Sequence, residues 1–381
     1  MDNEGNKKSA IDLHNTISAE QAYNLIKRSC QALIADPSQA SKLPPILLRG
    51  APGVGKSTIV QQVAKDLGIG FVDIRLAQRE PCDLRGLPVP NDETKSVDWY
   101  VTGDLPRDPD SKGILFFDEI TSADKSLQVA SYELILDRRL GKLYKVPDGW
   151  FIVAAGNRVT DRAVATAMSS ALANRLMHFE LDANAEDWYF WAIAHGLNPS
   201  VTGFIKYRPN LLFKMKDQNL EQGWPSPRSW ERVSNIIPQY GDDEDLLRSA
   251  VYGLVGNQAG VEFMEFHKIQ CEFDDVLEIL TDPKKEFTVP DKADRLYAFT
   301  SAVSYLLWSG KNEDDDKLRV SGLYRVAMKL SSDFATMLVK AATLGNARVP
   351  RLKAVQYIAE DPGYEEFQKK FGKQFAKKYK L

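Results

Sequence analysis

The chain has 381 residues, with 49 lysines and arginines against 52 aspartates and glutamates, a formal net charge of −3 and 3 cysteines. Hydrophobic residues make up 44% of it, which excludes a wholly disordered chain, and the balanced charge excludes a globally basic nucleic-acid binder. The sequence contains no apolar run near the ~18 residues of a membrane-spanning helix and no cysteine-rich zinc motif. Because residues 1–10 lack an apolar segment, we expect that they are not a signal peptide. We therefore expect a cytoplasmic protein of more than one domain.

Helix and strand signals alternate in the first half of the chain. After a helical stretch at residues 18–34, short apolar runs typical of strands recur with helical stretches between them. The strands are predicted at residues 46–48, 70–76, 113–117, 151–155 and 177–181, and the helices at 58–67, 127–140 and 163–176. This alternation indicates an α/β domain over residues 18–182, with a parallel sheet covered by helices on both faces, behind a flexible segment at residues 1–17.

The strand signal stops in the second half, where only helical spacing continues. We expect an all-α lid domain over residues 183–270 and an α-helical C-terminal region over residues 271–381. Within that region, the acidic run at residues 313–316 is predicted to be a solvated linker, and residues 318–344 are predicted to form one helix.

A glycine-rich motif stands between a predicted strand and the helix that follows it. It fits the pattern G-x-x-x-x-G-K-[ST], in which the glycines let backbone N–H groups surround phosphates. The lysine would reach the β- and γ-phosphates, and the serine would ligate Mg²⁺. A chance glycine-rich turn, the alternative, does not explain the strand-to-helix context. The candidate nucleotide-binding residues are Gly50, Ala51, Pro52, Gly53, Val54, Gly55, Lys56, Ser57 and Thr58.

Polar residues end two of the other predicted strands. Asp118 would hold Mg²⁺ and Glu119 would polarise an attacking water, because ligand sites in open α/β sheets lie at the carboxyl ends of strands. An acidic strand cap is the alternative. Two adjacent carboxylates favour water over a substrate hydroxyl as the nucleophile, and hence nucleotide hydrolysis. Asn157, at the end of another strand, would orient that water, unless it is only a turn residue.

Two arginines are candidates for contact with the phosphates. Arg228 follows a Ser-Pro pair typical of a helix start, where the helix dipole disfavours a cation unless an anion binds nearby. Arg175 ends a predicted helix, just before a strand. For both, an ordinary surface arginine is the alternative. Arg158 and Arg162 compete with Arg175 as the arginine that reaches a neighbouring subunit.

The order of these motifs resembles that of the AAA+ ATPases, which are P-loop NTPases. The resemblance implies Walker A in the glycine-rich motif, Walker B at Asp118 and Glu119, sensor 1 at Asn157, the arginine finger at Arg175 and sensor 2 at Arg228. It further implies a ring, typically a hexamer, that depends on ATP and Mg²⁺. The MoxR-like branch is the most similar. Three stretches carry this resemblance, namely Asp83-Leu84-Arg85-Gly86-Leu87-Pro88-Val89-Pro90, Gly149-Trp150-Phe151-Ile152-Val153-Ala154-Ala155-Gly156-Asn157 and Pro225-Ser226-Pro227-Arg228-Ser229-Trp230.

Members of the MoxR-like branch often work as chaperone-like remodellers beside a partner with a von Willebrand factor A domain. The branch carries an insertion before Walker B that often faces the pore of the ring. By this resemblance, Trp99 and Tyr100 are candidates to grip a polypeptide, although we favour the expectation that they pack on the core. The 4 histidines lack metal-ligand spacing and are expected to be structural or surface residues.

Three functions stay open. A hydrolytic remodeller of a protein partner is favoured, because the near-neutral charge does not favour a nucleic-acid partner. A nucleotide-controlled switch is a second alternative, against which the hydrolytic carboxylates argue. A nucleic-acid-dependent motor or loader would need a basic surface, for which the candidates are Lys206, Arg208, Lys214, Lys216 and the lysines of residues 369–380.

Overall fold

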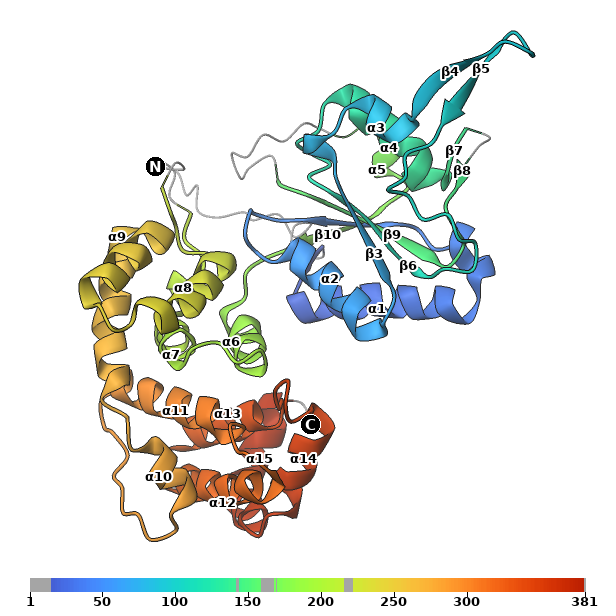
Figure 1. Cartoon of the computed structure of the whole chain (residues 1–381). Helices are drawn as coiled ribbons and strands as arrows, with labels where there is room; N and C mark the ends of the chain where they lie inside the picture. Colours follow the sequence, from blue (N-terminus) through green and yellow to red (C-terminus); the bar gives the residue numbers. More distant parts are fainter. Residues whose placement is uncertain (1–14, 142–143, 159–167, 169, 216–221, 380–381) are drawn as a thin grey trace, which may run out of the picture. The chain divides into compact units, whose positions relative to one another are not determined.

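The computed structural model describes residues 15–141, 144–158, 168, 170–215 and 222–379. The chain forms two compact units, Met1–Ala183 and Asn184–Leu381 (Figure 1). Most of the helix predicted at residues 163–176, and with it the candidate Arg162, lies outside the described residues. Within the described ranges, no helix is both long enough and apolar enough to cross a membrane.

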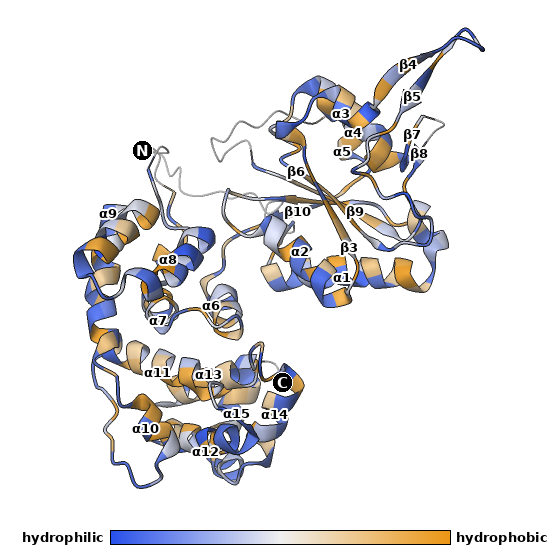
Figure 2. Ribbon diagram, in the orientation of Figure 1, coloured by the Kyte–Doolittle hydropathy of each residue, from blue (hydrophilic) through white to orange (hydrophobic). Residues whose placement is uncertain are grey.

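A 6-stranded parallel sheet forms the centre of the first unit. The strands lie in the order β1 (Thr16–Ile17), β10 (Met177–Leu181), β2 (Ile46–Arg49), β9 (Trp150–Gly156), β6 (Gly113–Asp118) and β3 (Gly70–Arg75). Strands β2, β6 and β9 are almost wholly buried and apolar, as in parallel sheets covered on both faces (Figure 2). This confirms the predicted α/β class, and it brings the carboxyl ends of β2, β9 and β6 next to one another.

Helices cover both faces of the sheet (Figure 1). On one face, α1 and α2 contact the sheet, and on the other face α4 packs against it. Because successive strand residues point to opposite faces, Leu115 and Phe117 share one core cluster with Leu127 and Leu134 of α4. The helical segments of this unit are α1 (Ala19–Ala35), η1 (Pro37–Ser41), α2 (Lys56–Leu67), η2 (Leu76–Gln78), α3 (Pro81–Arg85), α4 (Lys125–Leu136) and α5 (Ser170–Ala173).

Two β-hairpins complete the described part of the first unit. They are β4 (Leu87–Asn91) with β5 (Ser96–Tyr100), and β7 (Arg139–Leu140) with β8 (Tyr144–Lys145). The second hairpin corrects the helix predicted at residues 127–140, since α4 ends earlier. Arg138 adopts a φ of 54°, which an α-helix cannot contain, and its guanidinium donates to the backbone oxygens of Pro147 at 3.0 Å and Trp150 at 2.7 Å.

The second unit is helical in all its described elements. They are α6 (Ala185–Ala194), α7 (Pro199–Tyr207), η4 (Pro209–Leu211), α8 (Pro227–Tyr240), α9 (Glu244–Cys271), α10 (Val276–Thr281), α11 (Ala293–Leu307), α12 (Glu313–Lys329), α13 (Ser332–Ala342), α14 (Arg351–Glu360) and α15 (Gly363–Tyr379). Residues 184–381 make one compact unit by their contacts, so the boundaries at 182/183 and 270/271 stay predictions.

Two predictions for the second unit were wrong. Residues 313–316 are the first turn of α12 rather than a solvated linker, and Asp316 is only 1% exposed. Residues 318–344 are not one helix, because α12 ends at a C-cap, Leu330, whose backbone is extended, and α13 then begins after Ser331. Helical spacing of the apolar residues continues across this break, which is why the sequence pattern did not reveal it.

Candidate functional site

The glycine-rich motif forms a loop that leads from β2 into α2. Gly53 and Gly55 have φ angles of 81° and 100°, a region that residues with a Cβ rarely adopt. At Gly50, a Cβ would lie 2.5 Å from the backbone oxygen of Leu181. Gly55 caps α2 without any side-chain hydrogen bond, so the first backbone N–H groups of the helix are left for another acceptor. This arrangement fits an anionic phosphate, as predicted for residues 50–57.

Lys56 connects this loop to the tip of β9. Its side chain is buried at 8% exposure, and its Nζ donates to the backbone oxygens of Gly50 at 2.6 Å and Ala51 at 3.1 Å. The same Nζ lies 3.2 Å from Oδ1 of Asn157. The structure thus brings together two residues that are 101 positions apart, Lys56 and Asn157. Thr58, in contrast, is exposed on the first turn of α2.

Ser57 and Asp118 form the second link between the motifs. Oγ of Ser57 donates to Oδ2 of Asp118 at 2.7 Å, which joins the start of α2 to the end of β6. A hydroxyl and a carboxylate side by side at a phosphate loop suit Mg²⁺, which takes few protein ligands and completes its shell with water and phosphate oxygens. The described residues contain no group of three or more His, Cys, Asp and Glu side chains that could hold a metal by themselves.

Glu119 follows in an uncommon backbone conformation. Its φ is 58°, and its N–H donates to Oδ1 of Asp118 at 2.8 Å. A left-handed φ at a residue other than glycine costs free energy and recurs at functional sites. The turn directs the chain away from β6 and leaves Glu119 only half-buried beside the motif residues. The structure therefore places the two carboxylates at the sheet edge where the sequence predicted them.

Asn157 is held by a residue that the sequence did not single out. Its N–H donates to Oγ1 of Thr121 at 2.9 Å, and Thr121 is 5% exposed. A Cβ on Gly156 would lie 2.6 Å from the Thr121 side chain, so glycine at this position lets the strand end approach the threonine. No spacing rule predicts this contact, because the two residues come close only after β6 and β9 have paired.

The three candidate arginines of the first unit differ in their surroundings. Arg158 is engaged at the end of β10, since it forms ion pairs with Asp182 and, at 3.5 Å, with Glu180. Arg175 is exposed, and no carboxylate of the described residues pairs with its side chain. Arg162 lies outside the described residues. Of the two that are described, Arg175 has the side chain that is available to another molecule.

Arg228 stands in the first turn of α8, in the second unit. Ser226 caps this helix in a capping box with Ser229, and Pro227 occupies the first helical position, as expected. Arg228 is exposed, and within the described ranges no acidic side chain pairs with it. An unpaired cation therefore sits at the end of the helix dipole that favours anions.

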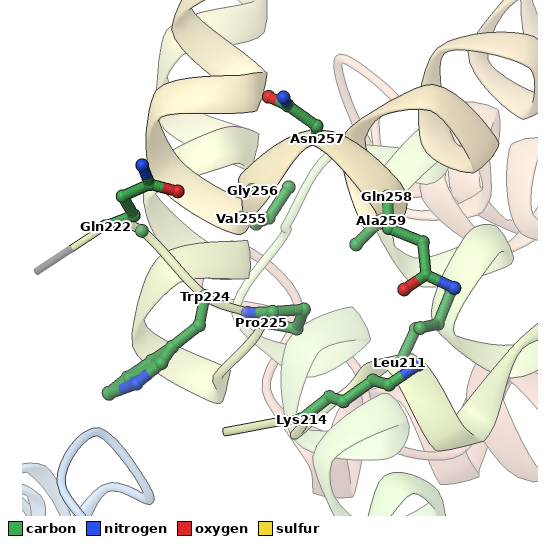
Figure 3. Close-up of a pocket in the computed structure, with 11 residues that line it drawn as sticks. Leu211, Lys214, Gln222, Trp224, Pro225, Val255, Gly256, Asn257, Gln258 and Ala259 are labelled. Carbon is green, nitrogen blue, oxygen red and sulfur yellow. The ribbon is translucent and has the colours of Figure 1, made fainter. Parts of the chain in front are cut away.

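A pocket lies next to the loop that leads into α8 (Figure 3). In this loop a Cβ on Gly223 would lie 2.2 Å from the backbone oxygen of Gly253, so the loop packs directly on α9. On the other side of the pocket α9 is kinked at Gly256, whose φ is 75° and ψ is 162°. The backbone N–H of Lys214 fastens the loop by donating to the oxygen of Pro225 at 3.0 Å. These contacts hold the start of α8 in place.

The structure corrects the favoured expectation for the aromatic pair of the insertion. Trp99 and Tyr100 belong to the β4–β5 hairpin and are 44% and 67% exposed, so they do not pack in the core. Leu87, Val89 and Val97 of the same hairpin are exposed as well. The hairpin therefore carries an apolar surface, defined by these five side chains.

Several known proteins resemble parts of this chain. Residues 45–176 match the family model of the AAA domain (dynein-related subfamily). Midasin of Giardia intestinalis is 27% identical over 193 residues, which are 49% of this chain, and the chain spans only 4% of midasin. Among solved structures, the RuvB Holliday junction branch migration motor of Thermotoga maritima is 19% identical, with 68% of this chain and 74% of RuvB covered and a TM-score of 0.34. A mutant of the same RuvB is 16% identical, with 92% and 94% covered and a TM-score of 0.34.

Proposed function

We propose that this chain, whose first unit has the AAA+ fold, binds ATP with Mg²⁺ and hydrolyses it to ADP and phosphate. The observation that carries the proposal is the pair of links across the sheet edge, Lys56 to Asn157 at 3.2 Å and Ser57 to Asp118 at 2.7 Å. These links place one ammonium, one hydroxyl, one carboxylate and one amide around the loop whose backbone fits phosphates. Such a set is what phosphoryl transfer to water requires.

Each residue has a role in this proposal. Backbone N–H groups of residues 50–57 bind the phosphates, and Lys56 stabilises their negative charge, which grows on the leaving group. Ser57 and Asp118 hold Mg²⁺, which supplies further positive charge at the phosphates when it is bound. Glu119 accepts a proton from the attacking water, and Asn157 orients that water. Thr121 keeps Asn157 in position through its hydrogen bond to the backbone.

Two arginines complete the proposed site. Arg228 acts on the ATP of its own chain, which explains a cation at a helix N-terminus without a described acidic partner. Arg175 acts on the ATP of a neighbouring subunit, as its exposure and the engagement of Arg158 by Asp182 support. An arginine supplied in trans accelerates phosphoryl transfer by about 10³–10⁵-fold where it has been measured. A site shared in this way calls for a closed ring, and we propose a hexamer.

We further propose that the ring acts in the cytoplasm as a MoxR-like, chaperone-like remodeller of a protein partner. The proposed partner is a protein that has a von Willebrand factor A domain. The exposed apolar side chains of the β4–β5 hairpin support a protein partner, because apolar surface of this kind binds apolar segments of other chains. The near-balanced charge of the chain supports it as well.

One set of variants tests the hydrolytic proposal. Lys56→Ala is expected to lose ATP binding, whereas Glu119→Gln should still bind ATP but release no phosphate. Phosphate release per subunit should rise with protein concentration as the ring forms, which is followed by size-exclusion chromatography with light scattering. A turnover rate that does not change with concentration in a monomeric preparation, or full activity in Glu119→Gln, would contradict the proposal.

A nucleic-acid-dependent motor is the second candidate, and one observation favours it. Helix α15 carries five exposed lysines, namely Lys369, Lys370, Lys373, Lys377 and Lys378. Stimulation of ATP turnover by DNA or RNA that weakens as salt rises would support this candidate over the protein remodeller.

A further inference from the structure

Strands β2 and β10 join two parts of the proposed machinery. β2 runs directly into the glycine-rich loop at Gly50, and β10 begins two residues after Arg175. The two strands pair in parallel, with His178 opposite Leu47 and Glu180 opposite Arg49. One strand pair therefore separates a subunit's own phosphate loop from the arginine that it would donate to its neighbour.

A histidine forms a side-chain link across this strand pair. Nδ1 of His178 bonds to Nη2 of Arg49, the last residue of β2, and Nε2 of His178 lies 2.6 Å from the backbone oxygen of Ala173. A guanidinium can only donate, so Nδ1 accepts, and the ring proton must be on Nε2, where it donates to Ala173. The imidazole is thus neutral in this arrangement, and both of its nitrogens are used.

The carbonyl that accepts this bond belongs to the turn that presents Arg175. Ala173 is the last residue of α5, and the backbone N–H of Arg175 donates to the oxygen of Leu172 at 3.1 Å. The Arg175 side chain is exposed and has no acidic partner in the described part of the chain. The backbone of this turn therefore determines the point from which the Arg175 side chain extends, and the turn is bonded to His178 through the oxygen of Ala173.

We propose that His178 is a positioning residue for Arg175. Through its bond to Arg49, His178 fixes the turn with Arg175 relative to the phosphate loop of the same subunit. A change at that loop would then reach the arginine finger that acts on the next subunit. The inference rests on the proposed function, since it requires Arg175 to act in trans. A misplacement of about 1 Å at a reacting group can cost about 10²-fold in rate, so loss of the His178 link should be measurable.

Mixed rings can test the proposal. A Lys56→Ala subunit cannot use ATP but still donates Arg175, whereas an Arg175→Ala subunit binds ATP but donates no finger. Each should be inactive alone, and a mixture of the two should regain phosphate release. The substitution His178→Ala is then added either to the finger donor, with Lys56→Ala, or to the ATP-binding partner, with Arg175→Ala. Thermal unfolding and binding of a fluorescent ATP analogue are measured for every subunit.

The expected result is a loss of about tenfold to 10²-fold when His178→Ala is in the finger donor and little change when it is in the ATP-binding partner. His178→Gln in the donor should recover part of the rate, because glutamine also has one acceptor and one donor for Arg49 and Ala173. Equal losses in both mixtures would show that His178 supports only the fold, and a loss confined to the mixture with His178→Ala in the ATP-binding partner would show that it serves only its own loop. Either result would overturn the inference. If the starting mixture regains no activity, the proposed trans role of Arg175 itself is wrong.

Discussion

The backbone of Glu119 has a φ of 58°, in the left-handed region that residues other than glycine seldom adopt. The N–H of Glu119 donates to Oδ1 of Asp118, and its backbone oxygen accepts from the N–H of Ser122 at 2.9 Å. These bonds hold the residue in a conformation that costs about 1–3 kcal/mol for a side chain with a Cβ. The proposed base thus lies at a position with a strained backbone. A substitution there changes the free energy of unfolding through the backbone conformation, and it changes ATP hydrolysis through loss of the carboxylate.

A pair of substitutions separates the two effects. Glu119→Asn should abolish ATP hydrolysis and raise the free energy of unfolding by about 1 kcal/mol, because asparagine tolerates the left-handed region better than glutamate does. Glu119→Gln should abolish hydrolysis with little change in stability, since its backbone preference is similar. Calorimetry of both variants provides the measurement, with an expected difference of about 2–4 °C in Tm. A lower Tm for Glu119→Asn than for Glu119→Gln would contradict this account of strain.

The first turn of α12 shows how an acidic run can be structural. Asn312 caps the helix, and acidic residues in a first turn are favoured by the helix dipole. Asp316 turns inward and pairs with Nη2 of Arg348, which also donates to the backbone oxygen of Trp308 at 3.0 Å. A Cβ on Gly310 would lie 2.4 Å from Oδ1 of Asp316, so the preceding loop closes directly over the carboxylate. The run therefore connects α11, α12 and the segment before α14.

Substitution of two acids in this turn distinguishes the buried from the solvated position. Asp316→Ala leaves Arg348 without its carboxylate and should lower the free energy of unfolding by about 2–3 kcal/mol, less than the about 3–5 kcal/mol of a fully buried pair, because Arg348 is 41% exposed. Asp314→Ala, at an exposed position of the same turn, should change it by less than about 0.5 kcal/mol. Chemical denaturation of both variants tests this, and equal effects would rule out a special role for Asp316.

Sequence patterns predict an element best where its local structure allows only a few residue types. The apolar strands of the sheet and the loop with Gly53 and Gly55 were found because burial and left-handed backbone leave few choices of residue. Thr121 and His178 are not found in this way, because each bonds to a residue that is distant in the sequence, Thr121 to Asn157 and His178 to Arg49. The expectation that Trp99 packs in the core is wrong, since the residue type alone does not distinguish a buried aromatic side chain from one on an exposed hairpin.

In the proposed function, both compact units have a role in ATP binding. The phosphate loop and the carboxylates belong to the first unit, and Arg228, proposed to act on the same ATP, belongs to the start of α8 in the second. The loop before α8 is packed on α9 at Gly223, so this helix start is a fixed feature of the second unit. Binding of ATP by both units would therefore couple the nucleotide state to the position of a helical unit of 198 residues, Asn184–Leu381.

Arg228 provides the test of this coupling. It is an exposed cation at a helix N-terminus without a described acidic partner, so Arg228→Ala should leave the stability of the chain unchanged or raise it by about 0.3–1 kcal/mol. The same variant should weaken ATP binding or turnover by at least about tenfold, as expected for the loss of one charge-assisted contact of about 1.5–3 kcal/mol.

Arg232→Ala, at another exposed position of α8, is the matched control and should change neither stability nor ATP binding and turnover. Isothermal titration with ATP, phosphate release and thermal unfolding measure the three quantities. A fall in stability with unchanged binding and turnover would mean that Arg228 serves the second unit alone, because loss of a residue that acts only on ATP cannot destabilise the chain in the absence of the nucleotide.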